Sequence, residues 1–469
     1  MPKRLWFGLL ILFVLAALGR AYLQYQQLTI DGDLAAIVLP ADWYAPVLHD
    51  PFGWAVLSRG AVYAAPNRFF AHWLLSSYFR AVPLWLQRFT TPIASVYLAI
   101  SLFKLATQAL LLYLLALYAG ATTDLRRLAP WLLMALLVPL FQTSGYNVQM
   151  GIIDHAVTYT AFYALPMALL LLWLLPFYWA AQRGAWAPLP WYRLVLLAAL
   201  AVVLALNGPV VQGMVAVLLL VIAGYWWTTR RAAEPLPWQP ALLLGWLGLL
   251  CLYSLYLGRY NAENLAATLS LGERYQRLPL GIFKLLTVKI GLPLLVLAVL
   301  VNARLIRRVA PSPEGQRLLT LLRWLGLFIA LYLLLLPLGG YRNYRPLILR
   351  RDTALPITLG VIIGYGATTY YLLRQLPATR LRRWYVVGIG ALSLLFLATD
   401  KLHIKGDNNA CEQAALAELA RAPAGVAHLP NTCLMLAWTP IADYHESATQ
   451  AALLQHWRIT WGLTLYDQQ

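Results

Sequence analysis

Two stretches, "LWFGLLILFVLAALG" (residues 5–19) and "LLTLLRWLGLFIALYLLLLPLGG" (residues 318–340), are apolar at nearly every position. Membrane-spanning helices require such continuous runs, whereas the strands of a membrane barrel alternate apolar and polar residues. Hydrophobic residues make up 61% of the chain and charged residues only 12%, about half the charged share of a typical soluble domain. The sequence therefore predicts an all-α polytopic membrane protein.

We expect eleven spans connected by loops on alternate sides of the membrane. Their ranges are roughly 5–24, 92–119, 128–142, 157–181, 192–206, 210–229, 240–258, 285–302, 317–338, 354–373 and 384–399. With an uncleaved first span and a cytoplasmic N-terminus, the long loop of residues 25–91 and the tail of residues 400–469 lie outside. Residues 1–399 then form a membrane domain, and the tail forms a small α+β cap. Residues 68–86 of the long loop are expected to form an amphipathic helix in the membrane interface.

The formal net charge of +18 raises the question of a nucleic-acid partner, but the distribution of the charge indicates membrane topology instead. Lys and Arg dominate the loops expected inside, as the positive-inside rule requires. All seven histidines and all but three of the 18 acids fall on the outer side, the exceptions being Asp124, Glu234 and Glu314. Candidate catalytic groups therefore face away from the cytoplasm, and no nucleic-acid partner is predicted.

The first outer loop opens with "TIDGDLAAIVLPADWYAPVLHDPFG" (residues 29–53), which gathers four aspartates in a chain that is otherwise short of acid. Asp31 and Asp33 form a D-x-D pair. Carboxylates at this spacing either share a divalent cation, such as Mg²⁺ or Mn²⁺, or act as a base and its orienting partner. The structural alternative is a turn around Gly32.

Three other groups of the same loop are secondary candidates. Asp50 precedes a proline, so capping of a short helix is the favoured interpretation. An acid–base pair with the adjacent His49 is the functional alternative. His72, in the stretch expected to form the interfacial helix, is the third.

Polar groups near the bilayer are further secondary candidates. Asp154 and His155 lie at the start of an apolar helix, where the helix dipole favours an acid; the functional alternative is a second wall of the same outer cavity. Lys104 falls near the middle of the expected second span, where a charge is costly and faces a cavity or a partner.

The stretch "GGYRNYRPLILRRD" (residues 339–352) places a cluster of arginines on an outer loop, where the positive-inside rule does not call for them. The cluster consists of Arg342, Arg345, Arg350 and Arg351. Guanidinium groups bind phosphate in a bidentate fashion, so the loop is a candidate phosphate clamp, with a solvated loop that balances the outer acids as the alternative. Additional basic residues that can join it are Arg59, Arg68, Arg80, Lys284 and Lys289.

Three cysteines fit the same topology. Cys411 and Cys433 lie in the outer tail, where an oxidising compartment permits a disulfide between them. Cys251 falls inside an expected span and is predicted to be a small core residue.

This layout, one span followed by a long outer loop that carries "DGD" (residues 31–33), resembles the GT-C class of membrane glycosyltransferases. The stretches "GDLAAIVLP", "DPFG" and "GGYRNYRP" also resemble sequences of Bacteroidota membrane proteins without an assigned activity. The GT-C resemblance implies transfer of a sugar from a polyprenyl-phosphate carrier to a glycan, lipid or protein acceptor on the non-cytoplasmic face. It further implies that Asp33 or Asp31 is the catalytic carboxylate and that "YRNYRPLILRR" (residues 341–351) binds the lipid phosphate.

We therefore expect an inverting glycosyltransferase of the bacterial inner membrane, with its C-terminus in the periplasm. A divalent cation is compatible with the D-x-D pair but is not required. Two other hypotheses are a transporter or flippase for a lipid-linked or anionic substrate, and a non-catalytic subunit of envelope assembly. The observation that best separates them is whether Asp33 and Arg345 face one cavity.

Overall fold

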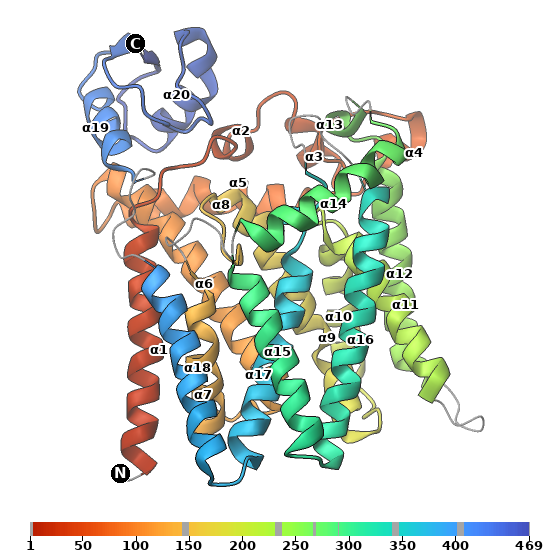
Figure 1. The fold of residues 1–469 in the computed structure, drawn as a ribbon. Coiled ribbons are helices and arrows are strands. Elements are labelled where there is room, and N and C mark those ends of the chain that lie inside the picture. The colour runs from red at the N-terminus through yellow and green to blue at the C-terminus, as the bar shows by residue number, and fades with distance from the viewer. Residues whose placement is uncertain are drawn as a thin grey trace.

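The computed structural model describes residues 3–142, 150–229, 237–265, 269–288, 290–339, 347–400 and 408–468. They form a helix bundle with a small mixed α+β segment at the end that carries the C-terminus, and the N-terminus lies at the opposite end (Figure 1). The long apolar helices are α1 (Lys3–Tyr25), α6 (Pro92–Gly120), α9 (Leu165–Arg183), α11 (Val211–Thr229), α12 (Trp238–Gly258), α16 (Pro313–Leu335), α17 (Leu355–Gln375) and α18 (Arg380–Thr399). A short helix α8 (Val157–Tyr159) and the π-helical turn η2 (Thr160–Ala164) lead directly into α9.

Eleven spans are not confirmed. The described residues contain eight helices that are long and apolar enough to cross a bilayer, or nine if α14 and α15, which meet at 80°, count as one span. Two expected spans are instead the shorter helices α7 and α10, of 10 and 15 residues. At about 1.5 Å per residue such helices fall short of a hydrocarbon core of about 30 Å. The bounds of these elements are α7 (Leu128–Leu137), η1 (Val138–Leu140), α10 (Trp191–Ala205), α14 (Leu271–Thr287), α15 (Gly291–Arg308) and η3 (Leu336–Leu338).

Helix α17 lies in the middle of the bundle, where it packs on α6, α15 and α16 and buries most of its side chains. Helices α1 and α18 lie at the margin and expose apolar side chains along much of their length, including Leu12, Leu15, Trp384 and Leu394. Lipid tails solvate such faces, whereas water does not. The chain is therefore a multi-pass membrane protein.

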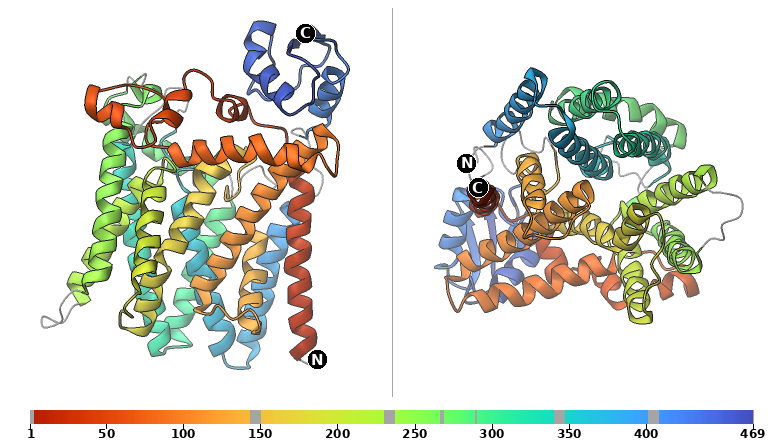
Figure 2. Two further views of the ribbon diagram at one scale, coloured as in Figure 1. Left: turned by 180° about the vertical axis from the view of Figure 1, so that it is seen from behind. Right: turned by 90° about the horizontal axis from the view of Figure 1, so that it is seen from below.

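Short helices cover the end of the bundle that carries the C-terminus. They are α2 (Leu34–Val38), α3 (Ala45–His49), α4 (Trp54–Arg59), α5 (Phe69–Leu86) and α13 (Ala262–Leu265). Helix α5 runs across the bundle end (Figure 2). It buries Ala71, Leu75 and Phe79 and exposes Trp73 and Trp85, as expected for an amphipathic helix at a membrane interface. The helix expected over residues 68–86 is confirmed.

The C-terminal segment, residues 408–468, is hereafter the cap. It consists of α19 (Ala410–Leu419), β1 (Gly425–Leu429), η4 (Tyr444–Ser447), α20 (Ala448–His456) and β2 (Thr464–Gln468), and the two strands pair in parallel. A disulfide joins Cys411 to Cys433, with their Cα atoms 6.0 Å apart, while Cys251 is buried and free. These features agree with the expected α+β segment, disulfide and core cysteine.

The cap is attached to α5 through a buried tryptophan. The indole Nε1 of Trp457 donates a hydrogen bond to the Phe79 carbonyl at 2.8 Å, and Gln87 Nε2 donates to the Trp457 carbonyl at 2.6 Å. Because Trp457 is fully buried, the cap and the interfacial helix share one core.

Candidate functional site

The DGD turn (residues 31–33) connects α1 to α2 at the cap end of the bundle. Its two carboxylates have different partners. Asp31 is buried and accepts hydrogen bonds from the Thr158 hydroxyl at 2.9 Å and the Thr158 amide at 3.2 Å. Asp33 is partly exposed and accepts from the indole Nε1 of Trp438, in the cap, at 2.8 Å. The turn is therefore held by the bundle on one side and by the cap on the other.

Burial and, next, the neighbouring Asp33 carboxylate raise the pKa of Asp31 to about 6, against the two hydrogen bonds from Thr158 and the charge of Lys104, which lower it. A carboxylic acid with this pKa changes its protonation state just below neutral pH. Proton-transfer groups have such values, although a buried structural acid can have one as well.

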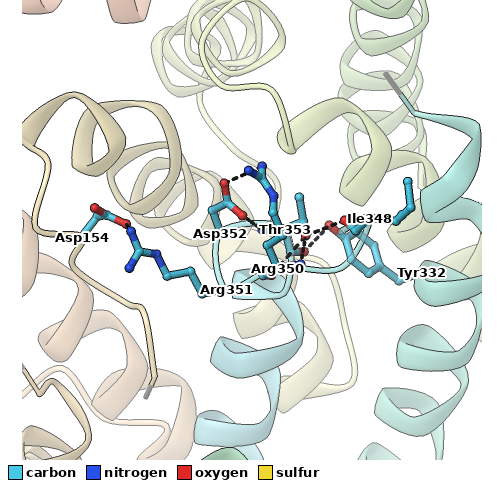
Figure 3. Close-up of polar contacts among 7 residues, drawn as sticks. All are labelled: Asp154, Tyr332, Ile348, Arg350, Arg351, Asp352 and Thr353. Carbon is cyan, nitrogen blue, oxygen red and sulfur yellow. Dashed lines mark hydrogen bonds and ion pairs between the residues drawn. The ribbon is translucent and has the colours of Figure 1, made fainter. Parts of the chain in front are cut away.

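A charge cluster lies on the bundle side of the DGD turn. Arg351 Nη2 and Asp154 Oδ2 are 2.7 Å apart (Figure 3). The fully buried ammonium group of Lys104 donates to the His155 carbonyl and lies 5.0 Å from the centre of the Tyr25 ring. The carboxylates of Asp154 and Asp31 favour the Lys104 charge, whereas Arg351 opposes it, and this balance explains how a lysine is tolerated inside the second expected span.

Gly151 permits the ion pair between Arg351 and Asp154. Its φ is +62°, and a Cβ at this position would lie 2.9 Å from the Arg351 Cβ. Any other residue would be strained there and would push the arginine away.

The arginine-rich loop is described only in part. Arg342 and Arg345 lie outside the described residues, as does Lys289. Arg350 Nη2 and Asp352 Oδ2 are 2.8 Å apart, and the Arg350 amide donates to the Thr353 hydroxyl at 2.8 Å. Figure 3 shows that the adjacent arginines point to different sides of the loop, Arg351 toward Asp154 and Arg350 toward Asp352.

Arg350 also lines a cavity of about 740 Å³ between α11, α12, α14, η3 and the loops at the cap end. Three other arginines share it, and we call it the arginine cavity: its basic residues are Arg68, Arg259, Arg274 and Arg350. The predicted phosphate ligands Arg68 and Arg350 are thus brought together. Arg351 pairs with Asp154 instead, and Arg59, Arg80 and Lys284 are exposed elsewhere on the surface.

Arg259 and Arg274 were not predicted as site residues. Both lie in the polar stretch of residues 258–284. A signal was present in the capping-box pattern of Ser270 and Glu273. In the structure the Ser270 hydroxyl accepts from the Glu273 amide at 3.3 Å, and the Ser270 amide donates to the Glu273 carboxylate at 2.7 Å. This capping box defines the start of α14, one turn before Arg274.

Two of the four arginines are compensated by carboxylates. Arg68 and Glu263 are 3.8 Å apart, and Arg350 pairs with Asp352. Arg274 donates instead to the Gly339 carbonyl at 3.0 Å. Within the described ranges, no carboxylate lies within 4.0 Å of Arg274 or Arg259. The cavity therefore carries an excess of positive charge, which favours an anion.

A neutral donor adds to this preference. Asn261 is 1% exposed, and its Oδ1 accepts from the amides of Ala65 and Glu263, both at 3.1 Å. Its Nδ2 has no hydrogen-bond partner among the described residues, and Asn261 lines the arginine cavity. A buried donor without a partner is costly, so a ligand oxygen in the cavity would relieve that cost.

Among the described residues Asp33 does not line the arginine cavity, but its charge reaches Tyr44, which contacts the cavity wall. The Tyr44 hydroxyl donates to Glu263 Oε1 at 3.0 Å, and Glu263 pairs with Arg68 on the cavity wall. Burial raises the pKa of Tyr44, the charges of Glu263 and Asp33 raise it further, and Arg68 lowers it. Asp33 and the cavity arginine therefore act on the same hydroxyl.

A row of aromatic rings follows a parallel route. The rings of Trp438 and Tyr159 are 6.0 Å apart, and those of Tyr159 and Tyr163 are 5.8 Å apart. Tyr163 lines the arginine cavity, whereas Trp438 bonds Asp33. The DGD turn and the cavity are thus the two ends of one aromatic row.

The secondary candidates of the first loop have structural surroundings. Asp50 accepts from the Trp54 amide at 2.7 Å and the Ala55 amide at 2.9 Å, so it caps α4 as favoured. His49 is exposed at the end of α3. His72 is buried between Tyr44 and Phe162, and burial, followed by the charge of Arg68, lowers its pKa to about 3. His72 is therefore neutral at physiological pH.

The described residues contain no group of three or more His, Cys, Asp or Glu side chains that could hold a metal ion. Asp31 and Asp33 point to different hydrogen-bond partners, as described above.

No known protein-family model matches this chain, and a search of curated proteins found no match.

Proposed function

We propose that the chain is a membrane glycosyltransferase that takes a sugar from a polyprenyl-phosphate carrier and transfers it to an acceptor at the cap end of the bundle. That end would face the periplasm of a bacterium, with the N-terminus in the cytoplasm. The carrier phosphate would bind in the arginine cavity, and the acceptor would approach Asp33 from the side of the cap. The proposal agrees with the resemblance of the chain's layout to the GT-C class.

The observation that carries the proposal is a cavity with an excess of arginines at the same end of the bundle as the Asp33 carboxylate. Four arginines and Asn261, whose Nδ2 has no partner among the described residues, line the cavity. The aromatic row of Trp438, Tyr159 and Tyr163 extends from the Asp33 carboxylate to the wall of this cavity. An acid and a phosphate clamp at opposite ends of a substrate are what the transfer of a phosphate-linked group requires.

The cavity also suits a lipid. Apolar side chains make up much of its wall, among them Leu255, Leu335, Leu336 and Leu338. Phosphate and the first isoprene units of a carrier lipid have this combination of one charged end and an apolar body. The lining extends only to Val217 on α11 and Leu255 on α12, close to the cap end of both helices. This shallow position favours a surface reaction over a transport path.

In the proposed reaction Asp33 accepts the proton of an acceptor hydroxyl. The hydroxyl oxygen forms a bond to the anomeric carbon of the donor sugar, and the bond from that carbon to the phosphate oxygen breaks. The polyprenyl phosphate leaves with the electron pair, and the configuration at the anomeric carbon is inverted. Arg259 and Arg274 stabilise the extra negative charge of the leaving phosphate. Asp31, with its raised pKa, would be the second carboxylate of the site.

The test uses the full chain purified into lipid nanodiscs with a radiolabelled polyprenyl-phosphate sugar. Product formation and donor hydrolysis are followed for the wild type, Asp33→Asn and Arg350→Gln. Arg80→Gln, on the exposed face of α5, is the matched control for charge. We expect Asp33→Asn to lower the transfer rate by roughly 100-fold or more and Arg80→Gln to leave it unchanged. Transfer retained in Asp33→Asn would exclude Asp33 as the base.

One observation favours a second function, a non-catalytic subunit of envelope assembly. Asp31, Asp33 and Asp50 all have hydrogen-bond partners, and the Asp33 partner belongs to the cap. In that function the DGD turn serves only to fix the cap. A wild-type protein that binds polyprenyl phosphate but transfers no sugar from any carrier would support this alternative.

A further inference from the structure

Trp438 connects the cap to the DGD turn across 405 positions of sequence, with its Nε1 2.8 Å from Asp33 Oδ1. The backbone of the cap also touches the turn. A Cβ at Gly32 would lie 2.6 Å from the Trp438 amide nitrogen and 2.7 Å from its Cδ1. Glycine is therefore required between the two aspartates for the indole to reach Asp33.

The cap backbone adopts an uncommon conformation two residues before Trp438. Leu436 has a φ of +48° although it is not a glycine, and its side chain is completely buried. A non-glycine residue adopts this conformation only where surrounding contacts enforce it, and such residues are concentrated at functional sites.

A buried carboxylate supplies the contact. Glu412 is 0% exposed, and its Oε2 accepts from the Ile30 amide at 2.9 Å and the Tyr97 hydroxyl at 2.8 Å. Its Oε1 accepts from the Leu436 amide at 3.4 Å. Glu412 therefore joins the residue before Asp31 to the residue two before Trp438, and fixes the DGD turn and the cap segment relative to each other.

The disulfide strengthens this connection. Cys411 precedes Glu412 in the chain, and Cys433 lies three residues before Leu436. The covalent bond thus holds α19, which carries Glu412, against the segment that presents the indole. Four features together fix the position of the Trp438 indole N–H. They are the disulfide, the Glu412 side chain, the backbone conformation of Leu436 and the close contact at Gly32.

We propose that Trp438 is a positioning residue of the transfer reaction, so that the catalytic unit includes the cap. This inference rests on the proposed function. The indole N–H fixes the orientation of the Asp33 carboxylate and favours its ionised form, because a hydrogen bond to the charged state stabilises that state. The carboxylate is then ready to accept the acceptor's proton. A protein whose cap has shifted retains the arginine cavity but has a poorly oriented base.

The decisive variant is Trp438→Phe, which keeps an aromatic ring beside Tyr159 and removes the N–H. The control is Trp461→Phe, since Trp461 is 96% exposed on the same cap. We expect Trp438→Phe to lower kcat by roughly tenfold, to leave the KM for the donor unchanged and to shift the acidic limb of kcat/KM to higher pH. Trp461→Phe is expected to match the wild type.

A second variant reaches the same bond from the other side. Gly32→Ala leaves both side chains intact but places a methyl group where the cap backbone lies, and we expect the same shift of the acidic limb. A loss of thermal stability in Trp438→Phe and Gly32→Ala without any shift of the pH profile would overturn the inference. An unchanged kcat in Trp438→Phe would do so as well. A wild-type protein that transfers no sugar would refute the proposed function itself, whereas an active wild type with an unaffected Trp438→Phe refutes only the positioning role.

Discussion

Two buried asparagines differ in a way that separates structure from function in this molecule. Asn302 and Asn261 are each 1% exposed. Asn302, on α15, donates to the hydroxyls of Thr368 and Thr369, both at 3.0 Å, and accepts from Tyr385 at 3.0 Å. Asn261 lines the arginine cavity and has its acceptor satisfied, while its Nδ2 has no partner among the described residues.

The difference shows what a buried polar group contributes in each setting. The network around Asn302 is satisfied within the protein, so it holds α15, α17 and α18 together. Asn261 has a hydrogen-bond donor without a partner among the described residues, and the arginines of the same cavity supply positive charge. This combination suits a ligand with anionic oxygens. Changes at the first site should alter stability, and changes at the second should alter binding.

The largest effect is expected from the two cavity arginines that lack carboxylate partners in the described ranges. The double variant Arg259→Gln, Arg274→Gln should raise the KM for a polyprenyl-phosphate donor by roughly 100-fold, because two charge-assisted contacts are lost. Isothermal titration with polyprenyl phosphate provides the same comparison without catalysis. Arg126→Gln, at an exposed site outside the cavity, is the control. An unchanged affinity in the double variant would exclude the arginine cavity as the binding site of the carrier phosphate.

The matched pair Asn261→Asp and Asn302→Asp tests the comparison directly. Asn261→Asp keeps the oxygen that accepts from the Ala65 amide and replaces Nδ2, which has no partner among the described residues, by an acidic oxygen. The affinity for the polyprenyl-phosphate sugar should therefore fall by roughly tenfold. Asn302→Asp should instead lower the free energy of unfolding by about 1–3 kcal/mol, with little change in KM. Thermal unfolding and donor titration of both variants provide the measurement. The reverse pattern would contradict the distinction between the two sites.

Glu412 provides a pH test of the contact between cap and bundle. Burial raises its pKa from 4.5 to about 8, against three hydrogen bonds that lower it. The folded state therefore holds this proton more tightly than the unfolded chain, so the free energy of unfolding falls as pH rises from 4.5 through about 8. Glu412→Gln should abolish this component in thermal unfolding curves measured across that range, whereas the exposed Glu446→Gln should not. An unaltered pH dependence in Glu412→Gln would exclude Glu412 as its source.

The smallest effect is expected at His72. Its folded-state pKa of about 3 lies below the ordinary value of 6.5, so the unfolded chain binds a proton at His72 more readily than the folded protein. The free energy of unfolding therefore falls as pH falls from 6.5 toward 3. His72→Phe should remove that component, change stability at neutral pH by less than about 1.5 kcal/mol and leave the pH profile of transfer unmoved. A shifted profile would instead give His72 a part in proton transfer.

Features that depend on local pattern are predictable from the sequence. Continuous apolar runs reveal the membrane class, and the aromatic stretch of the first loop reveals α5. The capping role of Asp50 follows from the proline after it. The count of eleven spans is not confirmed, because an apolar run is a poor measure of helix length, as the short helices α7 and α10 illustrate.

The candidate site was predictable only in part, because it depends on contacts distant in sequence. Arg68 and Arg350 were expected on the outer side, and the structure places both in the lining of one cavity. Asn261 and Arg274 were hidden in a polar stretch of ordinary composition. Nothing local to Trp438 indicates that it bonds Asp33, since that bond forms only when α19, the disulfide and the first loop are assembled.

Helix α5 has a consequence for how the protein sits in a bilayer. Its exposed Trp73 and Trp85 favour the depth of the lipid headgroups, and Trp457 of the cap bonds its main chain. The depth at which α5 lies in the bilayer therefore determines the depth of the cap that is bonded to it. In bilayers of different thickness the hydrocarbon-facing helices would tilt or stretch the lipid around them, while the elements attached to α5 would keep their depth relative to the lipid headgroups.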